Sequence, residues 1–431
     1  MVKKILVYSL IFSIIILNIN LVQAQTKPSL LSESAILIDS NSGTILLEKN
    51  PNKKMHPASL TKIMTAIIAI ESGDLSDVIK VDDDTPYEIY GSHIALEPGE
   101  ILTLKDLLYA LMLPSANDAA AVIAKHYGGS IEEFVEQMNE KAKDLGAHNT
   151  NFVNPHGLHD ENHYSTASDL ALITKYAMKN ETFRKIVGTV KYEIKPTNKK
   201  SEVRYLATLN KLIHNTSTSQ IIVDGTYINT NYDGVTGVKT GYTPEAGNCL
   251  VASAEKNGTE LIAVTMKGVS LEMYQDAHNM FNFGFNEYQS ITIVKENTFI
   301  QNLQIKNGDS KEISLITESD FTTLTKKKSE NDIVSKIIVD EITLPLEKNS
   351  IVGKIEYSLD GKLLGSVNLI TPTEVKSTLI NSDESIIVTI IKFIANLGLF
   401  ILIIVLALKI YNGIRIKANR KRRRKKYRAD L

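Results

Sequence analysis

The sequence has 431 residues, 43% of them hydrophobic and 23% charged, which is enough for two or three domains, each with a core of its own. The formal net charge is −1, but residues 409–431 hold eleven Lys or Arg against one Asp. The rest of the chain is therefore acidic, which excludes nucleic acid as its main partner. Cys249 is the one cysteine, so no internal disulfide can form; its apolar neighbours predict a small buried side chain rather than a reactive thiol.

Residues 1–24 have the pattern of an export signal. Lys3 and Lys4 precede an apolar run, and the small residues Val22 and Ala24 occupy positions −3 and −1 before Gln25. We expect a signal peptide that is cleaved after Ala24, with an uncleaved membrane anchor as the alternative.

The second long apolar segment, residues 386–408, contains one charge, Lys392, and is long enough to cross a bilayer as a helix. The basic residues 409–431 follow it directly, which predicts that this tail is cytoplasmic and that the body of the protein lies on the extracytoplasmic side of the cell membrane. The tail then serves to fix the topology against anionic lipid. A helix lying in the membrane interface is disfavoured because the segment has no polar face.

Between these two ends, turn and cap signals divide the chain into short elements. Ser34–Asp39 and Thr44–Glu48 read as a hairpin, and a buried helix follows from Pro57. The next expected elements are a loop over 82–99, helices over 103–113, 119–127 and 131–145, a turn-rich loop over 154–163, a helix from 168, and short strands with polar loops over 189–232.

From Val235 the pattern returns to strands. A strand over 235–240 precedes a hairpin around Asn257-Gly258, and a helix over 272–285 follows. Strands from both ends of residues 25–288, with helices between them, predict an α/β sandwich of an antiparallel sheet and a helical region. Residues 289–378 alternate in short segments and predict a small all-β domain, which we interpret as a spacer or interaction module.

Ser59 and Lys62 lie three residues apart in the helix that begins at Pro57. Residues at i and i+3 share a face, and this helix is apolar on nearly every side, so it should be buried. Burial lowers the pKa of a lysine, and a neutral amine can activate a neighbouring serine as a nucleophile. The pattern alone is common, however, and Ser59 could instead be a helix-start serine with Lys62 reaching solvent.

Two later motifs decide between these interpretations. Ser115-Ala116-Asn117 lies between two helices, where Ser and Asn could also be helix caps. Lys239-Thr240-Gly241 lies in a strand, where it could be a solvated end. Three such motifs in this order, each in the local structure it needs, are the set that penicillin-recognising serine enzymes share, which favours an active site.

Residues 31–288 as a whole resemble the low-molecular-weight penicillin-binding proteins, the serine-type D-Ala-D-Ala carboxypeptidases of peptidase family S11. The β-rich segment and the membrane anchor also fit the layout of that family. Beyond the three motifs, the stretches that carry the resemblance are His56–Lys62, Asn154–Leu158, Tyr164–Asp169, Gly237–Thr243 and Cys249–Ala254.

The resemblance implies the sandwich fold of serine β-lactamases and penicillin-binding proteins, and an acyl-enzyme mechanism. Ser59 would attack the carbonyl between the two terminal D-alanines of a peptidoglycan pentapeptide after Lys62 takes its proton. Ser115 would relay the proton to the leaving D-alanine. No metal or cofactor is needed, and β-lactams should inhibit the enzyme by acylating Ser59.

The remaining site residues would bind the substrate. Asn117 offers an amide to the peptide backbone, while Lys239 and Thr240 offer a charge and a hydroxyl to the terminal carboxylate. Gly241 would let the peptide lie along the strand, and the backbone N–H groups of Ser59 and Tyr242 would form the oxyanion hole.

One departure and several alternatives remain. Met273 stands where many relatives carry an arginine, so a contact to the substrate carboxylate is expected to be missing. The same motifs would serve a β-lactamase, a D,D-endopeptidase or a transpeptidase, and a catalytically silent, membrane-anchored wall-binding protein is the alternative outside the enzymes. His156, His159 and His163 are grouped, but their spacing does not favour a metal site.

Overall fold

The computed structural model describes residues 27–213, 218–327, 329–378 and 382–426. The expected signal peptide over 1–24 lies outside these residues. The chain divides into two compact units: one contains the residues up to Ile291 together with Thr323–Asn331, and the other contains Thr292–Thr322 and the residues from Asp332 onward.

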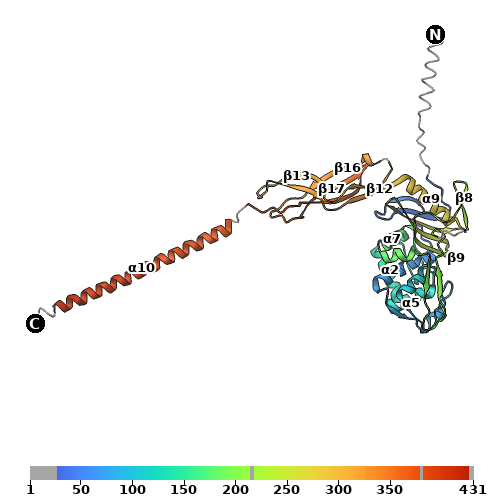
Figure 1. Ribbon diagram of the computed structural model, residues 1–431, viewed down its shortest axis with the longest axis horizontal. Coiled ribbons are helices and arrows are strands. Elements are labelled where there is room, and N and C mark those ends of the chain that lie inside the picture. The colour runs from blue at the N-terminus through green and yellow to red at the C-terminus, as the bar shows by residue number, and fades with distance from the viewer. Residues whose placement is uncertain (1–26, 214–217, 328, 379–381, 427–431) are drawn as a thin grey trace, which may run out of the picture. The chain divides into compact units, whose positions relative to one another are not determined.

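The first unit is built on a five-stranded antiparallel sheet in the order β2-β1-β11-β10-β9 (Figure 1). Both predicted hairpins are confirmed: β1 (Ser34–Asp39) pairs with β2 (Ile45–Lys49), and β10 (Gly247–Lys256) pairs with β11 (Thr259–Gly268). Strand β9 (Val235–Thr243) forms one edge of the sheet, so one side of its backbone has no strand neighbour among the described residues.

Both faces of this sheet are buried. Along β1, Ile36 and Ile38 belong to a large core with the central helices, whereas Ala35 and Leu37 belong to a second core with α9. Successive side chains of a strand point to opposite faces, which is why the strands read as continuous apolar runs. Figure 1 shows α2, α5 and α7 on one side of the sheet and α9 on the other, so the predicted α/β sandwich is confirmed.

Most helices begin and end close to the predicted positions, but the helix predicted from Pro57 begins only at Lys62, because a 3-10 turn over Ala58–Thr61 precedes it. Thr103 and Asp106 form a capping box at the start of α4, in which the Thr103 hydroxyl accepts from the Asp106 N–H and the Asp106 carboxylate accepts from the Thr103 N–H. The remaining helices of this unit are α2 (Lys62–Ser72), α3 (Thr85–Glu88), α4 (Leu104–Met112), α5 (Asn117–Gly128), α6 (Ile131–Asp144), α7 (Ala167–Ala177), α8 (Glu181–Val187) and α9 (Glu272–Glu287).

Three short strand pairs form separate two-stranded sheets in this unit. The segment expected to be a loop over 82–99 also contains the single turn α3, because Asp82 accepts the N–H and hydroxyl protons of Thr85. The pairs are β3 (Val78–Lys80) with β4 (Ile101–Thr103), β5 (Lys191–Ile194) with β6 (Arg204–Ala207), and β7 (Gln220–Val223) with β8 (Thr226–Asn229).

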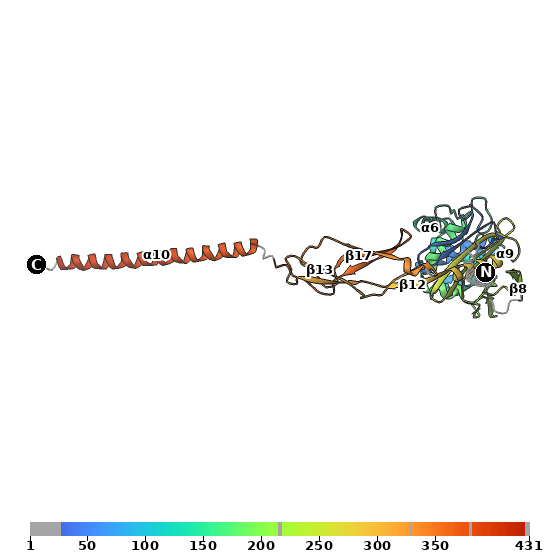
Figure 2. The same ribbon diagram turned by 90° about the horizontal axis from the view of Figure 1, so that it is seen from above.

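The second unit contains the predicted all-β domain and the apolar helix. Its antiparallel sheet, in which Figure 2 labels β13 and β17, has the order β13-β14-β18-β17-β16. The sheet has its own core, in which Leu315 and Leu369 are fully buried. The strands are β13 (Phe299–Gln304), β14 (Glu312–Thr317), β16 (Val334–Val339), β17 (Ile351–Leu359) and β18 (Lys362–Ile370); β12 (Tyr288–Val294) and β15 (Phe321–Lys326) pair separately.

The long helix α10 (Ser382–Lys426) contains the predicted spanning segment. By length and composition, Ile387–Arg423 is the one helix among the described residues that could cross a membrane. None of its apolar window is buried inside the protein. A helix this apolar and this exposed needs another apolar environment, which is what a bilayer supplies.

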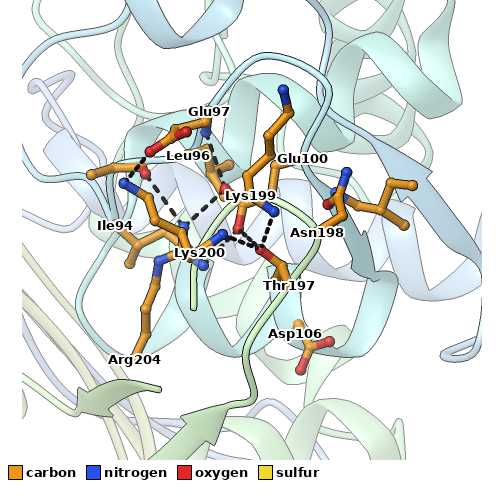
Figure 3. A network of polar contacts seen from close by, with 12 residues as sticks. Ile94, Leu96, Glu97, Glu100, Asp106, Thr197, Asn198, Lys199, Lys200 and Arg204 are labelled. Carbon is orange, nitrogen blue, oxygen red and sulfur yellow. Dashed lines mark hydrogen bonds and ion pairs between the residues drawn. The ribbon is translucent and has the colours of Figure 1, made fainter. Parts of the chain in front are cut away.

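A buried ion pair joins Glu100, in the loop before β4, to Arg204 at the start of β6 (Figure 3). Arg204 donates to both carboxylate oxygens of the fully buried Glu100, at 2.8 and 2.9 Å, and the Thr197 hydroxyl donates to Glu100 at 2.7 Å. The Arg204 guanidinium also reaches the Ala95 carbonyl at 3.4 Å. This network holds the loop that lies beside the N-terminus of α5.

We predict that Glu100→Gln lowers the free energy of unfolding by about 3 kcal/mol, because it leaves the Arg204 charge buried without its partner. Urea denaturation would measure the loss. Glu97→Gln is the matched control, since its partner Lys200 is partly exposed and the change should cost less than about 1 kcal/mol. Equal losses in the two variants would contradict the account.

Candidate active site

Ser59 lies in a tight turn directly before α2. Residues Ala58–Thr61 form a 3-10 turn, and Ala58 adopts the left-handed region with φ +47°, which is strained for an alanine. Strand β9 passes against this turn: a Cβ at Gly241 would lie 3.0 Å from the backbone nitrogen of Ser59. Only a glycine lets the edge strand come this close to the serine.

Lys62 is the first residue of α2 and its side chain is completely buried. Its Nζ atom lies 3.0 Å from Ser59 Oγ, 2.7 Å from Asn117 Oδ1 and 2.6 Å from the carbonyl oxygen of His156. A neutral amine has two N–H bonds and one lone pair. Asn117 and His156 can accept the two N–H bonds, which leaves the lone pair for the hydroxyl proton of Ser59.

The electrostatics of the cleft favour that neutral amine. Burial, and secondly the positive charge of Lys239, lower the pKa of Lys62 well below its ordinary value. Lys239 lies in β9, is 1% exposed, and donates to the Thr240 carbonyl at 2.9 Å. Burial also lowers the pKa of Lys239, to about 7. With Lys62 neutral, the positive charge of Lys239 makes the cleft favourable for a bound anion.

The second motif, Ser115-Ala116-Asn117, lies between α4 and α5 and contacts Lys62 through Asn117. Ser115 has φ +67° and is 4% exposed, and Asn117 is the first residue of α5. The Asn117 side chain accepts from Lys62 and donates to the Tyr90 carbonyl at 2.7 Å. Asn117 therefore binds protein atoms on both sides of its amide, and one N–H and one oxygen lone pair remain to bind a substrate.

The three predicted motifs thus meet at one place. They come from the turn before α2, from the loop between α4 and α5, and from the edge strand β9. Tyr242, which follows Gly241, pairs through its backbone with Asn248 and exposes 63% of its surface. Met273 lies elsewhere, in the core between α9 and the sheet, and is 7% exposed.

The loop over 154–163 contributes contacts that residue patterns did not predict. A Cβ at Gly157, where φ is +85°, would lie 1.9 Å from the Ala58 carbonyl oxygen, so this glycine packs directly on the peptide that precedes Ser59. Asn154 fixes it by accepting the Gly157 N–H at 2.7 Å. The run Asn154–Leu158 was noticed as part of the resemblance, but the functional atoms here are backbone atoms, which carry no side-chain signature.

His163 and Thr61 also hold this peptide. His163 Nδ1 accepts from the Val153 N–H at 3.1 Å, so its Nε2 carries the proton and donates to the Thr61 hydroxyl at 2.8 Å. Thr61 in turn donates to the Ala58 carbonyl at 2.8 Å. Burial lowers the pKa of His163 to about 4, so this chain of hydrogen bonds keeps one arrangement at neutral pH.

In the described part of the chain, no three His, Cys, Asp or Glu side chains are grouped so that they could hold a metal ion. Cys249 is buried in the large core, and burial raises the pKa of its thiol to about 11. It is the small buried side chain that its apolar neighbours predicted.

Comparison with known proteins identifies the architecture. A profile of the D-alanyl-D-alanine carboxypeptidases, peptidase family S11, matches residues 21–270, and a profile of the C-terminal domain of penicillin-binding protein 5 matches residues 288–377. D-alanyl-D-alanine carboxypeptidase DacF of Bacillus subtilis is 38% identical over 343 residues, which are 77% of this chain and 83% of DacF.

Solved structures agree. Penicillin-binding protein 5 from Haemophilus influenzae superposes with a TM-score of 0.66 at 28% identity and covers 82% of this chain and 99% of that one. A mutant of the Streptomyces K15 DD-transpeptidase gives a TM-score of 0.54 at 31% identity over 60% of this chain and 99% of that one. The fold is thus that of a penicillin-binding protein. The chain belongs to the D-alanyl-D-alanine carboxypeptidase family and is a D-alanyl-D-alanine carboxypeptidase, which confirms the resemblance and the activity inferred from its motifs.

We predict that Gly157→Ala lowers the rate of acylation by penicillin at least about a hundredfold, because the new methyl group displaces the Ala58–Ser59 peptide by about 1 Å or more. Gly146→Ala is the matched control: its φ is +83°, but nothing lies within 4 Å of the added methyl group. The two variants carry the same backbone strain, so similar acylation rates in stopped-flow measurements would rule out the displacement.

Proposed function

We propose that this carboxypeptidase is serine-type, with Ser59 as the nucleophile and Lys62 as its general base. The observation that carries the proposal is the set of contacts at Lys62 Nζ, because two carbonyl acceptors direct its lone pair toward Ser59 Oγ. In this protein Lys62 is buried away from water, so its amine is available in the neutral form that proton removal requires.

The reaction proceeds in two steps. As Lys62 takes the hydroxyl proton, Ser59 Oγ forms a bond to the carbonyl carbon between the two D-alanines, and the negative charge on the carbonyl oxygen is stabilised by the N–H groups of Ser59 and Tyr242. Collapse breaks the C–N bond, and the proton passes from Lys62 through Ser115 to the leaving amine. Water then adds to the ester and releases the shortened peptide from Ser59.

Substrate binding uses the edge of the sheet. The terminal carboxylate pairs with the Lys239 charge and the Thr240 hydroxyl, and the peptide adds to β9 as an extra strand, which Gly241 permits. Asn117 steadies the peptide backbone from the opposite wall. Met273 is uncharged and is packed in the core. Lys239 therefore binds the substrate carboxylate without the arginine that contributes to this contact in many relatives.

The acceptor of the acyl group separates this proposal from its alternatives. One structural relative is named a transpeptidase, in which an amine would replace water. A β-lactamase would need a carboxylate to activate water rapidly. Asp118, next to Asn117, is instead held by the N–H groups of Ile94, Leu96 and Ala119. These contacts support an enzyme that uses water to hydrolyse the acyl-enzyme formed with its peptide substrate and that releases bound β-lactams only slowly.

The same proposal includes the location of the enzyme. The signal peptide directs residues 25–288 and 289–378 across the membrane as a catalytic and a β-rich domain, and α10 anchors them with residues 409–431 in the cytoplasm. The substrates are peptidoglycan stem peptides, and β-lactams are the inhibitors. Protease added outside intact cells should digest the extracytoplasmic domains and leave the basic tail intact. Digestion of the tail instead would show that the proposed topology is wrong.

We predict that a fluorescent penicillin labels the wild-type enzyme and not Ser59→Ala, since the variant has no hydroxyl to acylate. Release of D-alanine from an acyl-X-D-Ala-D-Ala peptide should fall at least about a thousandfold in the same variant. Ser42→Ala, in the exposed turn between β1 and β2, is the control that keeps full activity. Labelling that persists in Ser59→Ala would refute the assignment.

We predict that the protonation of two lysines, Lys62 and Lys239, sets the pH dependence of kcat/KM. Activity rises as Lys62 loses its proton, because only the neutral amine acts as a base. It falls above about pH 7 as Lys239, whose pKa burial lowers to about 7, loses the charge that binds the carboxylate. Lys239→Arg stays charged, so its profile should lose the alkaline fall and keep the acid limb. An unchanged alkaline limb in Lys239→Arg would exclude Lys239 as its cause.

A further inference from the structure

The carboxylate of Asp118 is buried beside the active site without taking part in the proposed reaction. Asp118 is the second residue of α5, directly after Asn117, and is 3% exposed. Within the described residues, no ion pair joins it to a cation. Its oxygens instead accept the backbone N–H groups of Ile94, Leu96 and Ala119, at 2.9 to 3.3 Å. The carboxylate therefore ties the loop before β4 to the start of α5.

Earlier residues of the same loop hold Asn117. The Tyr90 carbonyl accepts from Asn117 Nδ2, and the Ser92 carbonyl accepts from the Asn117 backbone N–H, both at 2.7 Å. Between them, Gly91 has φ +85°, and a Cβ there would lie 2.9 Å from Asn117 Nδ2. Residues 90–92 therefore lie directly against the Asn117 amide.

The contact to Tyr90 decides which way this amide faces. A carbonyl oxygen can only accept, so the Asn117 NH2 group faces Tyr90 and its Oδ1 faces Lys62 Nζ, at 2.7 Å. In the opposite orientation, the NH2 group would face Lys62 and donate to its lone pair. That lone pair could then not take the proton of Ser59. The orientation of one amide thus decides whether the base is available.

Asp118 also acts on Lys62 through its charge. Burial and then the charge of Lys239 lower the pKa of Lys62, whereas the Asp118 carboxylate acts in the opposite direction. Two further titratable groups interact with Lys62, those of His156 and His163 in the loop before α7. Burial lowers the pKa of these histidines to about 3 and about 4, so both are neutral. Of these groups, Asp118 is the one whose charge favours a protonated Lys62.

We infer that Asp118 is a positioning residue for the acylation step. By accepting the loop N–H groups, its carboxylate keeps residues 90–92 against Asn117, and these residues keep the Asn117 oxygen directed toward Lys62. The chain of contacts runs from Asp118 through the loop backbone to the amide, and from the amide to the general base. This role rests on the proposed function, because it requires that Lys62 is the base.

Asp118→Asn tests this role in the full-length enzyme in detergent. The variant should be acylated by penicillin about tenfold more slowly or worse, because its NH2 group cannot accept the loop N–H groups and the loop then moves away from Asn117. Asp276→Asn is the matched control. Asp276 is also a buried carboxylate that accepts two backbone N–H groups, those of Leu31 and Ser32, but it lies on α9, on the other side of the sheet. In stopped-flow measurements this control should keep the wild-type rate.

The pH dependence of acylation separates positioning from a loss of stability. Removing the Asp118 charge removes the influence that raises the pKa of Lys62, so the neutral amine becomes available at lower pH. The acid limb of the profile should therefore move to lower pH in Asp118→Asn, while the maximum rate falls. Asp276→Asn should keep the wild-type limb, as would any variant whose loss is only structural.

A second variant disturbs the same amide from the loop. Gly91→Ala leaves Asp118 in place but adds a methyl group 2.9 Å from Asn117 Nδ2, so it should also slow acylation. Gly225→Ala is its control, since φ there is +75° and nothing lies within 4 Å of the methyl group. Because both changes act on one amide, Gly91→Ala combined with Asp118→Asn should be at most about twofold slower than the slower single variant, whereas independent losses would multiply.

The outcomes separate the inference from the proposed function. Acylation of Asp118→Asn at the wild-type rate, an acid limb that does not move to lower pH, or losses that multiply would each overturn the inference and leave the serine mechanism standing. If Asp118→Asn does not fold, Gly91→Ala decides: slower acylation than Gly225→Ala supports the inference, and an equal rate overturns it. Penicillin labelling of Ser59→Ala would refute the proposed function and this inference together.

Discussion

The buried amine of Lys62 is the constraint on which the rest of the site depends. Removing a lysine side chain from water costs several kcal/mol unless its hydrogen-bonding groups find partners. Here the partners come from three segments far apart in the sequence: Ser59 in the turn before α2, Asn117 at the start of α5, and the His156 carbonyl in the loop before α7. Satisfying one nitrogen atom therefore also fixes the mutual positions of three segments of the candidate site.

The surrounding fold supplies the energy that this arrangement needs. Ala58 and Ser115 both adopt left-handed backbone conformations, which cost roughly 1–3 kcal/mol each for residues other than glycine. The large core formed by one face of the sheet and the helices packed on it offsets these costs through apolar burial. Gly157, Thr61 and His163 then confine the strained turn, so that the strain positions Ser59 instead of being relieved by a shift of the backbone.

Local chemistry made much of the fold predictable. The Asn257-Gly258 turn, the Thr103–Asp106 capping box and the short apolar run of β1 each depend on neighbours within a few residues, and the structure has all three. The second compact unit and its apolar helix were equally visible, because strand alternation and a long apolar run need no tertiary information.

The site itself was predictable only in part. Side chains with characteristic chemistry, such as Ser59, Lys62 and Lys239, could be recognised from their spacing. The carbonyl groups of His156 and Tyr90 could not, because every residue has a carbonyl and only the folded chain decides which one meets a catalytic side chain. The left-handed conformation of Ala58 was not predicted, because residues with a Cβ such as alanine rarely adopt positive φ and no sequence pattern indicates it.

The free edge of β9 has one more consequence. An unpaired strand at the border of a sheet is a template on which any extended chain can add, and soluble proteins usually blunt such borders to avoid self-association. Lys239 is a charge buried on this strand, and burying it beneath a neutral chain leaves it uncompensated. Under the proposed function, a polypeptide therefore gains little by docking there unless it ends in its own carboxylate, and the same lysine would select chain termini over the interior of other proteins.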